Sequence, residues 1–183
     1  LIHVGRIVPK NGLEDTIRAL TFLPSNISFA QIGAGPDKDK LLELARMCGV
    51  GDRVRFLGFI DHRELPKYLQ AADVFVQPSL SEGMGNVFIE AMAAGTPVVA
   101  TQVGGIADFL FDPERNPDRE PTGRAVDPHD PEGIARAVTR YREDTEMTKR
   151  IVENARAMVR EKYDWGHVVR AMRVRVFSRI QNI

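Results

Sequence analysis

Short, continuous apolar runs alternate with segments of helical periodicity along the chain. Runs such as "ISFAQIG", "DVFVQPS" and "PVVAT" are separated by patterns such as "DKDKLLELARMCG" and "NVFIEAMAAG". Strands that are apolar throughout are buried on both faces, and strand–helix alternation with short connections is typical of a parallel sheet covered on both sides. The sequence therefore predicts an α/β fold: a Rossmann-like, doubly wound parallel sheet of about six strands with C-terminal helices.

Element boundaries follow from the same pattern. We expect strands over 1–8, 27–33, 53–59, 73–79, 97–101 and 123–127, and helices over 12–23, 37–49, 61–72, 86–95 and from 131 onward. Asp61 and Glu64 are expected to cap the third helix, with Pro66 tolerated in its first turn. The Pro-rich stretch Phe111–Gly123 is expected to be an exposed excursion.

Length and charge restrict the function classes. The 183 residues suit one domain, 1–183, and the 25 basic and 25 acidic residues balance. Zero net charge gives no general reason to expect a nucleic acid, and at most a peripheral membrane contact is expected. The single cysteine, Cys48, cannot form an internal disulfide, which suits the reducing cytoplasm. Cys48 is expected to be a packing residue. Because the chain opens in a buried strand without Met, we expect it to be a piece of a longer protein.

In parallel sheets, ligands bind at the carboxyl ends of the strands. This rule selects the loops around Arg6, Gly33, Gly58, Ser81 and Gly104.

The fourth of these loops carries two glutamates eight positions apart. Glu82 precedes a Gly83-Met84-Gly85 turn, and a helix is expected to start near Asn86, where free N–H groups and the helix dipole favour a phosphate. Glu90, about one turn inside that helix, can accept two hydrogen bonds from a vicinal diol such as a ribose. Glu82 can do the same for a second sugar. This arrangement suits a nucleoside diphosphate sugar.

The competing interpretation is that Glu90 is a helix-face residue and that the glycines only close a turn. On spacing alone, the two interpretations are about equal. The surroundings favour a ligand, because Glu90 lies on a short apolar helix, "NVFIEAMAAG", where a charge needs a partner.

The stretch "SEGMGNVFIEAMAAGTPVVATQVGG" resembles the donor-site signature of the group 1 family of retaining glycosyltransferases with the GT-B fold, which contains a Glu-x(seven)-Glu pair. "HVGRIVPKNG", "QIGAGPDKDKL", "RVRFLGFIDHRELPKYLQAADVFVQPS" and "YDWGHVV" agree in order and spacing. The resemblance runs from end to end but covers only the C-terminal, donor-binding half of that family. It implies an N-terminal domain that provides most of the acceptor site.

By this resemblance, Glu90 holds the ribose hydroxyls and Glu82 holds hydroxyls of the transferred sugar. The other implied donor-site residues are Gly83, Met84, Gly85 and Asn86 through their N–H groups, Val87 beside the phosphates, Gly33 and Gly58 near the base and phosphates, and Gly104 and Gly105 closing the site. Gly104 and Gly105 could equally form a plain strand-to-helix turn.

The family pattern also implies an Arg after the first strand and a Lys five residues later, which neutralise the diphosphate. Arg6 fits the first position, but Asn11 occupies the second. We expect Lys10 either to supply the missing charge from one position earlier or to be a solvated surface residue. Fixed cations aimed at developing charge are a main catalytic term.

No metal or other cofactor is expected, because His3, His62, His129 and His167 do not cluster at ligand spacing and no Asp-x-Asp triplet is present. Trp165 is expected to anchor the C-terminal helix. The arginines of the tail are expected to form a solvated face or to contact the absent domain: Arg156, Arg160, Arg170, Arg173, Arg175 and Arg179.

The resemblance thus implies a hexosyltransferase that uses a UDP- or GDP-sugar and a glycan or lipid-linked acceptor. It is expected in the cytoplasm or peripherally at the inner face of the membrane. The front-face reaction attributed to such enzymes needs no nucleophile or base from this half, and the isolated chain is expected to be inactive. The alternatives are a nucleotide-sugar 2-epimerase of the same fold and a non-catalytic nucleotide-sugar-binding module.

Overall fold

The computed structural model describes residues 1–164, 166 and 169 of the chain. In this part, the strands form one sheet in the order β3-β2-β1-β4-β5-β6, and every neighbouring pair is parallel. The strands are β1 (Ile2–Val4), β2 (Phe29–Ile32), β3 (Val54–Gly58), β4 (Phe75–Gln77), β5 (Val98–Thr101) and β6 (Arg124–Val126). The predicted parallel sheet of about six strands is confirmed.

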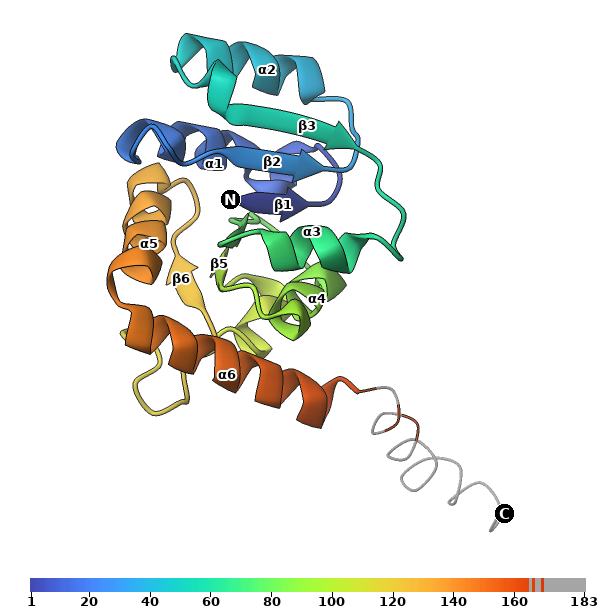
Figure 1. Cartoon of the computed structure of the whole chain (residues 1–183), viewed down its shortest axis with the longest axis vertical. Helices are drawn as coiled ribbons and strands as arrows, with labels where there is room; N and C mark the ends of the chain where they lie inside the picture. Colours follow the sequence, from blue (N-terminus) through green and yellow to red (C-terminus); the bar gives the residue numbers. More distant parts are fainter. Residues whose placement is uncertain (165, 167–168, 170–183) are drawn as a thin grey trace.

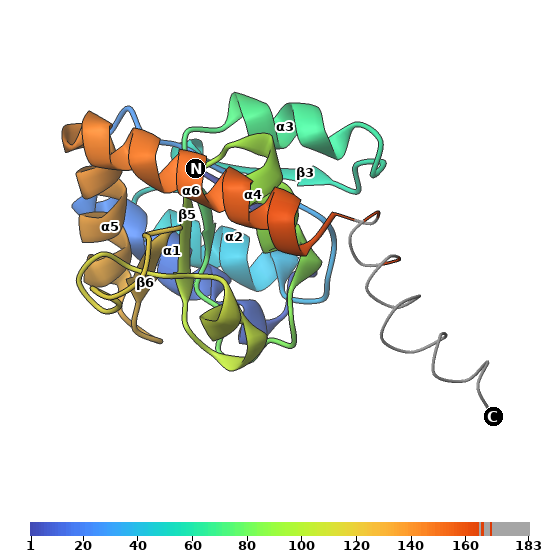
Figure 2. The ribbon, with the colours of Figure 1, turned by 90° about the horizontal axis from the view of Figure 1, so that it is seen from below.

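Helices cover both faces of the sheet (Figure 1). They are α1 (Leu13–Ala19), α2 (Lys38–Met47), α3 (Leu65–Ala71), α4 (Asn86–Ala94), α5 (Pro131–Glu143) and α6 (Thr145–Lys162), with 3-10 turns η1 (Pro9–Asn11), η2 (Leu20–Phe22), η3 (Gly51–Arg53) and η4 (Gly104–Asp108). In Figure 2, α6 crosses over α4, against which it packs. The sheet is therefore doubly wound.

Neighbouring residues of the central strands point into two separate cores. Val76 of β4 and Val99 of β5 pack with side chains of α1, α2 and α5. Phe75 and Val98 pack with side chains of α3, α4 and α6. All four are fully buried. Burying an apolar side chain of this size contributes about 1.5–3 kcal/mol, so consecutive positions of these strands are apolar because both faces are covered, and the polar residues Gln77 and Thr101 come only at the strand ends.

Most predicted boundaries differ by a few residues in the structure, and two of these differences change the interpretation. β1 ends at Val4, where the chain leaves the sheet, rather than continuing through residue 8. α3 begins at Leu65 rather than near Asp61, and its first residue has no side-chain cap. The carboxylate of Asp61 instead accepts a hydrogen bond from the Arg63 N–H at 2.8 Å. The predicted capping pair Asp61 and Glu64 is thus wrong, although Pro66 does lie in the first turn.

The stretch Phe111–Gly123 is less exposed than predicted. Its middle lies at the surface, but both ends are anchored, and Asp112 and Thr122 are buried. The Asp112 carboxylate accepts hydrogen bonds from the N–H groups of Glu114 and Ala125, at 2.8 and 2.9 Å. The composition of this stretch predicts an exposed segment, but the structure shows a loop whose backbone is held by the buried carboxylate of Asp112.

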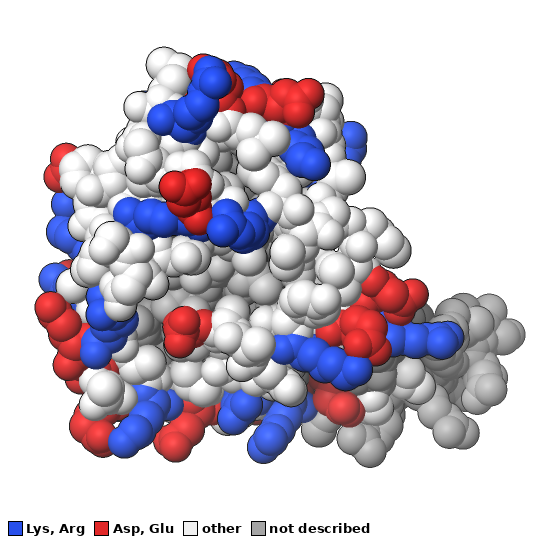
Figure 3. All heavy atoms as spheres, turned by 45° about the horizontal axis from the view of Figure 1, so that its top comes forward, with Lys and Arg blue, Asp and Glu red and all other residues white. Residues whose placement is uncertain are grey.

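The remaining expectations concern the surface and the tail. Cys48 packs against the core, as predicted. No helix in the described part of the chain is both long and apolar enough to cross a bilayer. On the face shown in Figure 3, basic side chains are interspersed with acidic ones. The predictions for six residues concern positions outside the described part of the chain: Trp165, His167, Arg170, Arg173, Arg175 and Arg179.

His3 lies in the middle of the sheet. It pairs in register with Gln31 of β2 and has no exposed surface. Burial lowers the pKa of His3 to about 4, because the imidazolium ion would lose its hydration, and the Gln31 side chain opposes this shift only in part. The ring is therefore neutral at pH 7.

This burial predicts acid-sensitive stability. The unfolded chain binds a proton at His3 near pH 6.5, whereas the folded chain binds it only near pH 4. Stability is therefore lost as the pH falls through this window, by about 2 kcal/mol between pH 7 and pH 5. We expect His3→Leu to lose about 2 kcal/mol less than the wild type over this interval, measured by urea unfolding at both pH values. Parallel losses in the two proteins would show that His3 is not the responsible group.

Candidate functional site

The strand order changes direction between β1 and β4. β2 and β3 extend the sheet from one side of β1, whereas β4, β5 and β6 extend it from the other. Helices that follow β1 and β4 therefore leave on opposite faces, and the loops before them diverge. In doubly wound sheets, ligands bind at this switch point, at the carboxyl ends of the strands. It lies between the loop carrying Arg6 and Lys10 and the loop carrying Glu82.

These two loops are in main-chain contact. The Leu80 N–H, after β4, donates to the Lys10 carbonyl, after β1, at 2.7 Å. Gly12 has a φ of 70°, and a Cβ there would lie 2.1 Å from the Pro78 carbonyl oxygen. Only glycine permits both this conformation and this close approach.

Other predicted loops join the same edge of the sheet. The Gly33 N–H donates to the Gly58 carbonyl at 2.7 Å, which links the loops after β2 and β3. The Gly105 N–H donates to the Gly83 carbonyl at 2.8 Å, which links the loops after β5 and β4. The structure thus brings the loops selected from the sequence to one edge, held together largely by backbone.

Helix α4 begins at Asn86, where the sequence predicted it. Gly85 occupies the N-cap with a φ of 67° and offers no side-chain cap. Among the described residues, no hydrogen-bond partner is present for the N–H groups of Met84, Gly85, Asn86 and Val87. Unpaired N–H groups at a helix N-terminus, together with the helix dipole, form an anion-binding site.

Glu82 lies beside this helix start and is half-buried. Its Oε1 accepts a hydrogen bond from the Gly83 N–H at 3.0 Å. The neighbouring loop leaves no room at its backbone, since a Cβ on Gly104 would lie 1.9 Å from the Glu82 carbonyl oxygen. The backbone of Glu82 is thus held in place, while its carboxylate is bound only to the adjacent amide.

Glu90 lies in the second turn of α4, with 35% of its side chain exposed. Burial raises the pKa of the Glu90 carboxyl, and His62 opposes this shift. His62 Nε2 is 3.9 Å from Glu90 Oε1, and His62 belongs to the turn between β3 and α3. We did not predict His62 from the sequence, although its position just after a strand on the ligand-bearing edge was a usable signal.

Both ends of α4 are fixed by contacts with other elements. Phe88, in its first turn, is fully buried and packs edge-to-face on Phe75, with ring centroids 5.5 Å apart. At the other end, the Arg156 guanidinium of α6 donates to the Ala94 carbonyl at 2.8 Å. This donor satisfies a helix-terminal carbonyl and places positive charge at the negative end of the dipole. α4 can therefore hold Glu90 rigidly.

The basic residues of the first loop differ in their surroundings. Arg6 and Lys10 are exposed, and within the described part of the chain neither side chain forms an ion pair. Asn11, at the position where the family pattern has Lys, is 5% exposed and donates to the Arg6 carbonyl at 2.7 Å. Asn11 thus stabilises the loop, and Lys10 is the nearest available cation in the chain to replace the expected lysine.

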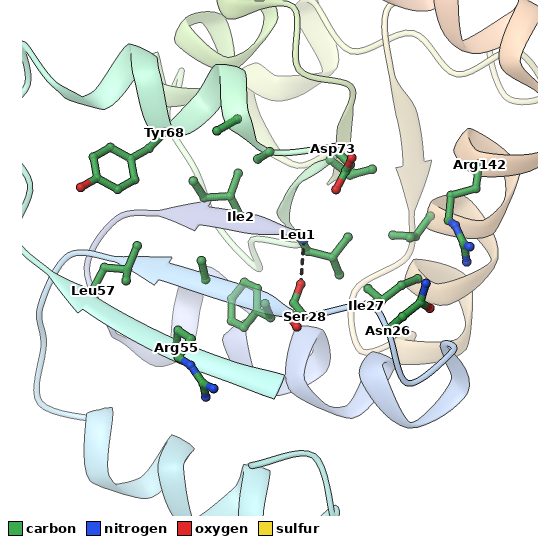
Figure 4. Close-up of a pocket in the computed structure, with 16 residues that line it drawn as sticks. Leu1, Ile2, Asn26, Ile27, Ser28, Arg55, Leu57, Tyr68, Asp73 and Arg142 are labelled. Atoms are coloured by element: carbon green, nitrogen blue, oxygen red, sulfur yellow. Dashed lines mark hydrogen bonds between the residues drawn. The ribbon is translucent and has the colours of Figure 1, made fainter. Parts of the chain in front are cut away.

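Two of the cavities in the described part of the chain bear on the position of the site. A cavity of about 580 Å³ lies where the strands begin, bordered by Leu1, Ser28 and Asp73 (Figure 4). A smaller one, of about 270 Å³, lies between α3 and α4 and is bordered by His62 and Glu90. The larger cavity lies at the edge of the sheet opposite to the two glutamates. Because parallel sheets bind ligands where the strands end, we place the candidate site at the edge with the glutamates.

Comparison with known proteins identifies the family and the fold of the chain. The family described as "Glycosyl transferases group 1" matches residues 1–158. The chain belongs to this family. Its sheet also matches the C-terminal domain of a glycosyl transferase group 1 family protein from Francisella tularensis, with a TM-score of 0.76 and 27% identity over 90% of this chain and 86% of that one. The predicted C-terminal GT-B domain fold is confirmed.

Longer relatives match over part of their length. An uncharacterized glycosyltransferase of Methanocaldococcus jannaschii is 37% identical over 93% of this chain, which spans 42% of the relative. The structure of Anabaena HepE in complex with UDP-glucose has a TM-score of 0.84 and 25% identity, over all of this chain and 48% of that protein. The chain thus spans less than half the length of these relatives.

The contact between Gly104 and Glu82 predicts a large effect of a small substitution. Gly104→Ala places a methyl group against the Glu82 carbonyl in a left-handed conformation with a φ of 55°. We expect the free energy of unfolding to fall by about 1–3 kcal/mol, measured by urea unfolding. Gly83→Ala is the matched control, because a Cβ at Gly83 has no neighbour within 4 Å. Equal effects of both substitutions would contradict a specific loop contact.

Proposed function

We propose that this chain is the donor-binding domain of a retaining glycosyltransferase that moves a sugar from a nucleoside diphosphate sugar to an acceptor such as a growing glycan or glycolipid. The observation that carries the proposal is the unpaired amino end of α4, with Glu82 before it and Glu90 one turn inside it. An anion site flanked by two carboxylates matches a diphosphate that joins two sugars.

Each part of the donor then has a partner. The amides of Met84, Gly85, Asn86 and Val87 bind the diphosphate. Glu90 accepts hydrogen bonds from the ribose hydroxyls, and Glu82 turns from the Gly83 amide to hydroxyls of the transferred sugar. Because carboxylates are acceptors only, both sites require hydroxyl donors. Main-chain groups at Gly33 and Gly58 lie at the strand ends where base and phosphates approach.

Catalysis in this half is electrostatic. As the glycosidic bond breaks, negative charge grows on the leaving diphosphate, and fixed donors aimed at that charge lower the barrier. The α4 amides supply part of this stabilisation, and the exposed cations Arg6 and Lys10 supply the rest. The leaving phosphate takes the acceptor proton, so the domain needs no base of its own.

The nucleotide is proposed to be UDP or GDP. HepE, which shares the fold at 25% identity, binds UDP-glucose, which favours a UDP-sugar. Acceptor binding is assigned to an N-terminal domain, because the matched structure from Francisella tularensis is a C-terminal domain and the longer relatives extend well beyond this match.

One observation favours the second candidate, a non-catalytic nucleotide-sugar-binding module. Asn11 occupies the place of a catalytic cation and is buried in its own loop. Incubating the full-length protein with a UDP-sugar and an acceptor separates the candidates. Transfer to the acceptor supports the glycosyltransferase, an epimerised sugar identifies a 2-epimerase, and an unchanged donor identifies the binding module.

Glu90→Gln tests the ribose contact. An amide replaces the carboxylate without changing its size, and charge-assisted hydrogen bonds to the diol are lost. We expect the Kd for UDP to rise about tenfold, whereas the Kd for inorganic pyrophosphate, which has no ribose, stays the same. Isothermal titration calorimetry measures both.

Two further variants complete this experiment. Arg6→Ala should weaken both ligands, because it removes a phosphate partner. Glu43→Gln, on the exposed surface of α2, should weaken neither. Equal weakening of UDP and pyrophosphate by Glu90→Gln would contradict the assignment of Glu90 to the ribose.

A second prediction concerns the chain by itself. We expect the 183-residue chain to bind UDP or GDP weakly and to transfer no sugar, because acceptor binding is assigned to another domain. Thermal unfolding against a nucleotide panel measures binding, since a ligand of the native state raises the Tm. Release of UDP from UDP-glucose in the presence of acceptor sugars measures turnover. Acceptor-dependent turnover by this chain would overturn the two-domain assignment.

A further inference from the structure

His62 and Glu90 meet at the ligand-bearing edge, although they come from different elements. His62 lies in the turn between β3 and α3, and Glu90 lies on α4. Helix α3, which follows the turn that carries His62, packs on α4, and the hydroxyl of Thr96, just after α4, donates a buried hydrogen bond to the Leu69 carbonyl of α3 at 2.7 Å. The packing of the two helices thus brings the exposed turn that carries His62 next to Glu90.

The distance between the two groups is informative. His62 Nε2 and Glu90 Oε1 are 3.9 Å apart, which is too long for a direct hydrogen bond. An oxygen atom about 2.8 Å from each fits between them. A hydroxyl suits this position chemically, because it can accept from an imidazole N–H while it donates to a carboxylate.

The surroundings of Glu90 are short of solvent, whereas the His62 side chain is 79% exposed. Glu90 is half-buried, and burial raises the pKa of its carboxyl, which reflects lost hydration. The cavity beside the pair is lined largely by apolar groups, including Leu65, Pro66 and Ala93. A poorly hydrated carboxylate beside an apolar cavity is stabilised when a ligand donates a hydrogen bond to it.

We infer that His62 and Glu90 together clamp the ribose of the nucleotide, with one hydroxyl held between them and the second on Glu90. This inference rests on the proposed function and adds a specificity-determining residue to it. The clamp selects ribonucleotides, because a donor that lacks the shared hydroxyl leaves both groups without their partner.

The test pairs protein variants with nucleotide variants. The Kd is measured calorimetrically for UDP, 2′-deoxy-UDP and 3′-deoxy-UDP with the wild type, His62→Ala and His62→Gln. We expect His62→Ala to weaken UDP about fivefold to tenfold, the loss of one hydrogen bond. One of the two deoxy analogues lacks the hydroxyl that His62 and Glu90 share. For that analogue, His62→Ala should change the Kd less than twofold. His62→Gln, which keeps an N–H donor, should recover most of the UDP affinity.

Controls separate this inference from the proposed function. His129→Ala removes another exposed histidine that lies near a carboxylate, 3.5 Å from Asp15, and should leave all three Kd values unchanged. If His62→Ala weakens no nucleotide, or weakens UDP and both analogues equally, the clamp is overturned while the proposed function stands. If wild type binds no UDP or GDP, or if Glu90→Gln leaves UDP binding unchanged, the proposed function fails and the clamp fails with it.

Discussion

The loops that leave β1 and β4 meet at main-chain distance, and the rest of the candidate site depends on this contact. The Leu80 N–H reaches the Lys10 carbonyl at 2.7 Å, and Gly12 lies against the Pro78 carbonyl. A side chain at Gly12 would push the two loops apart and move Arg6 and Lys10 away from the start of α4. A doubly wound parallel sheet offers this junction only where the strand order reverses, so topology fixes the place and glycine fixes the distance.

Much of the fold follows from the sequence because the signals are local. Continuous apolar runs predict strands buried on both faces, and the structure has them at β2, β4 and β5 within a few residues of the predicted limits. The two errors have different causes. Asp61 can form either a helix cap or a local turn, and it accepts from the Arg63 N–H in a turn, two residues away. Asp112 looks exposed from composition but holds the backbone at Ala125, thirteen residues away, which a short window of sequence does not show.

The sequence likewise predicts some residues of the candidate site and misses others. The sequence places Glu82, Glu90 and the start of α4, because a strand end, a glycine turn and a helical pattern follow one another directly. It does not place His62 beside Glu90, since that pair depends on how α3 packs on α4. Nor does it show that Asn11 turns inward onto the Arg6 carbonyl, which leaves Arg6 and Lys10 as the exposed cations of the loop. Pairs formed between elements need the tertiary structure.

The ionised carboxylate of Glu90 lowers the stability of the folded domain. Burial raises the pKa of its carboxyl, so ionising it at neutral pH costs the folded domain free energy, which His62 offsets only in part. The helix that carries it is nevertheless rigid, with Phe88 packed on Phe75 at one end and the Arg156 guanidinium on the Ala94 carbonyl at the other. Under the proposed function, a ligand that donates hydrogen bonds to this half-buried carboxylate relieves that cost when it binds. Titratable groups with a perturbed pKa concentrate at functional sites.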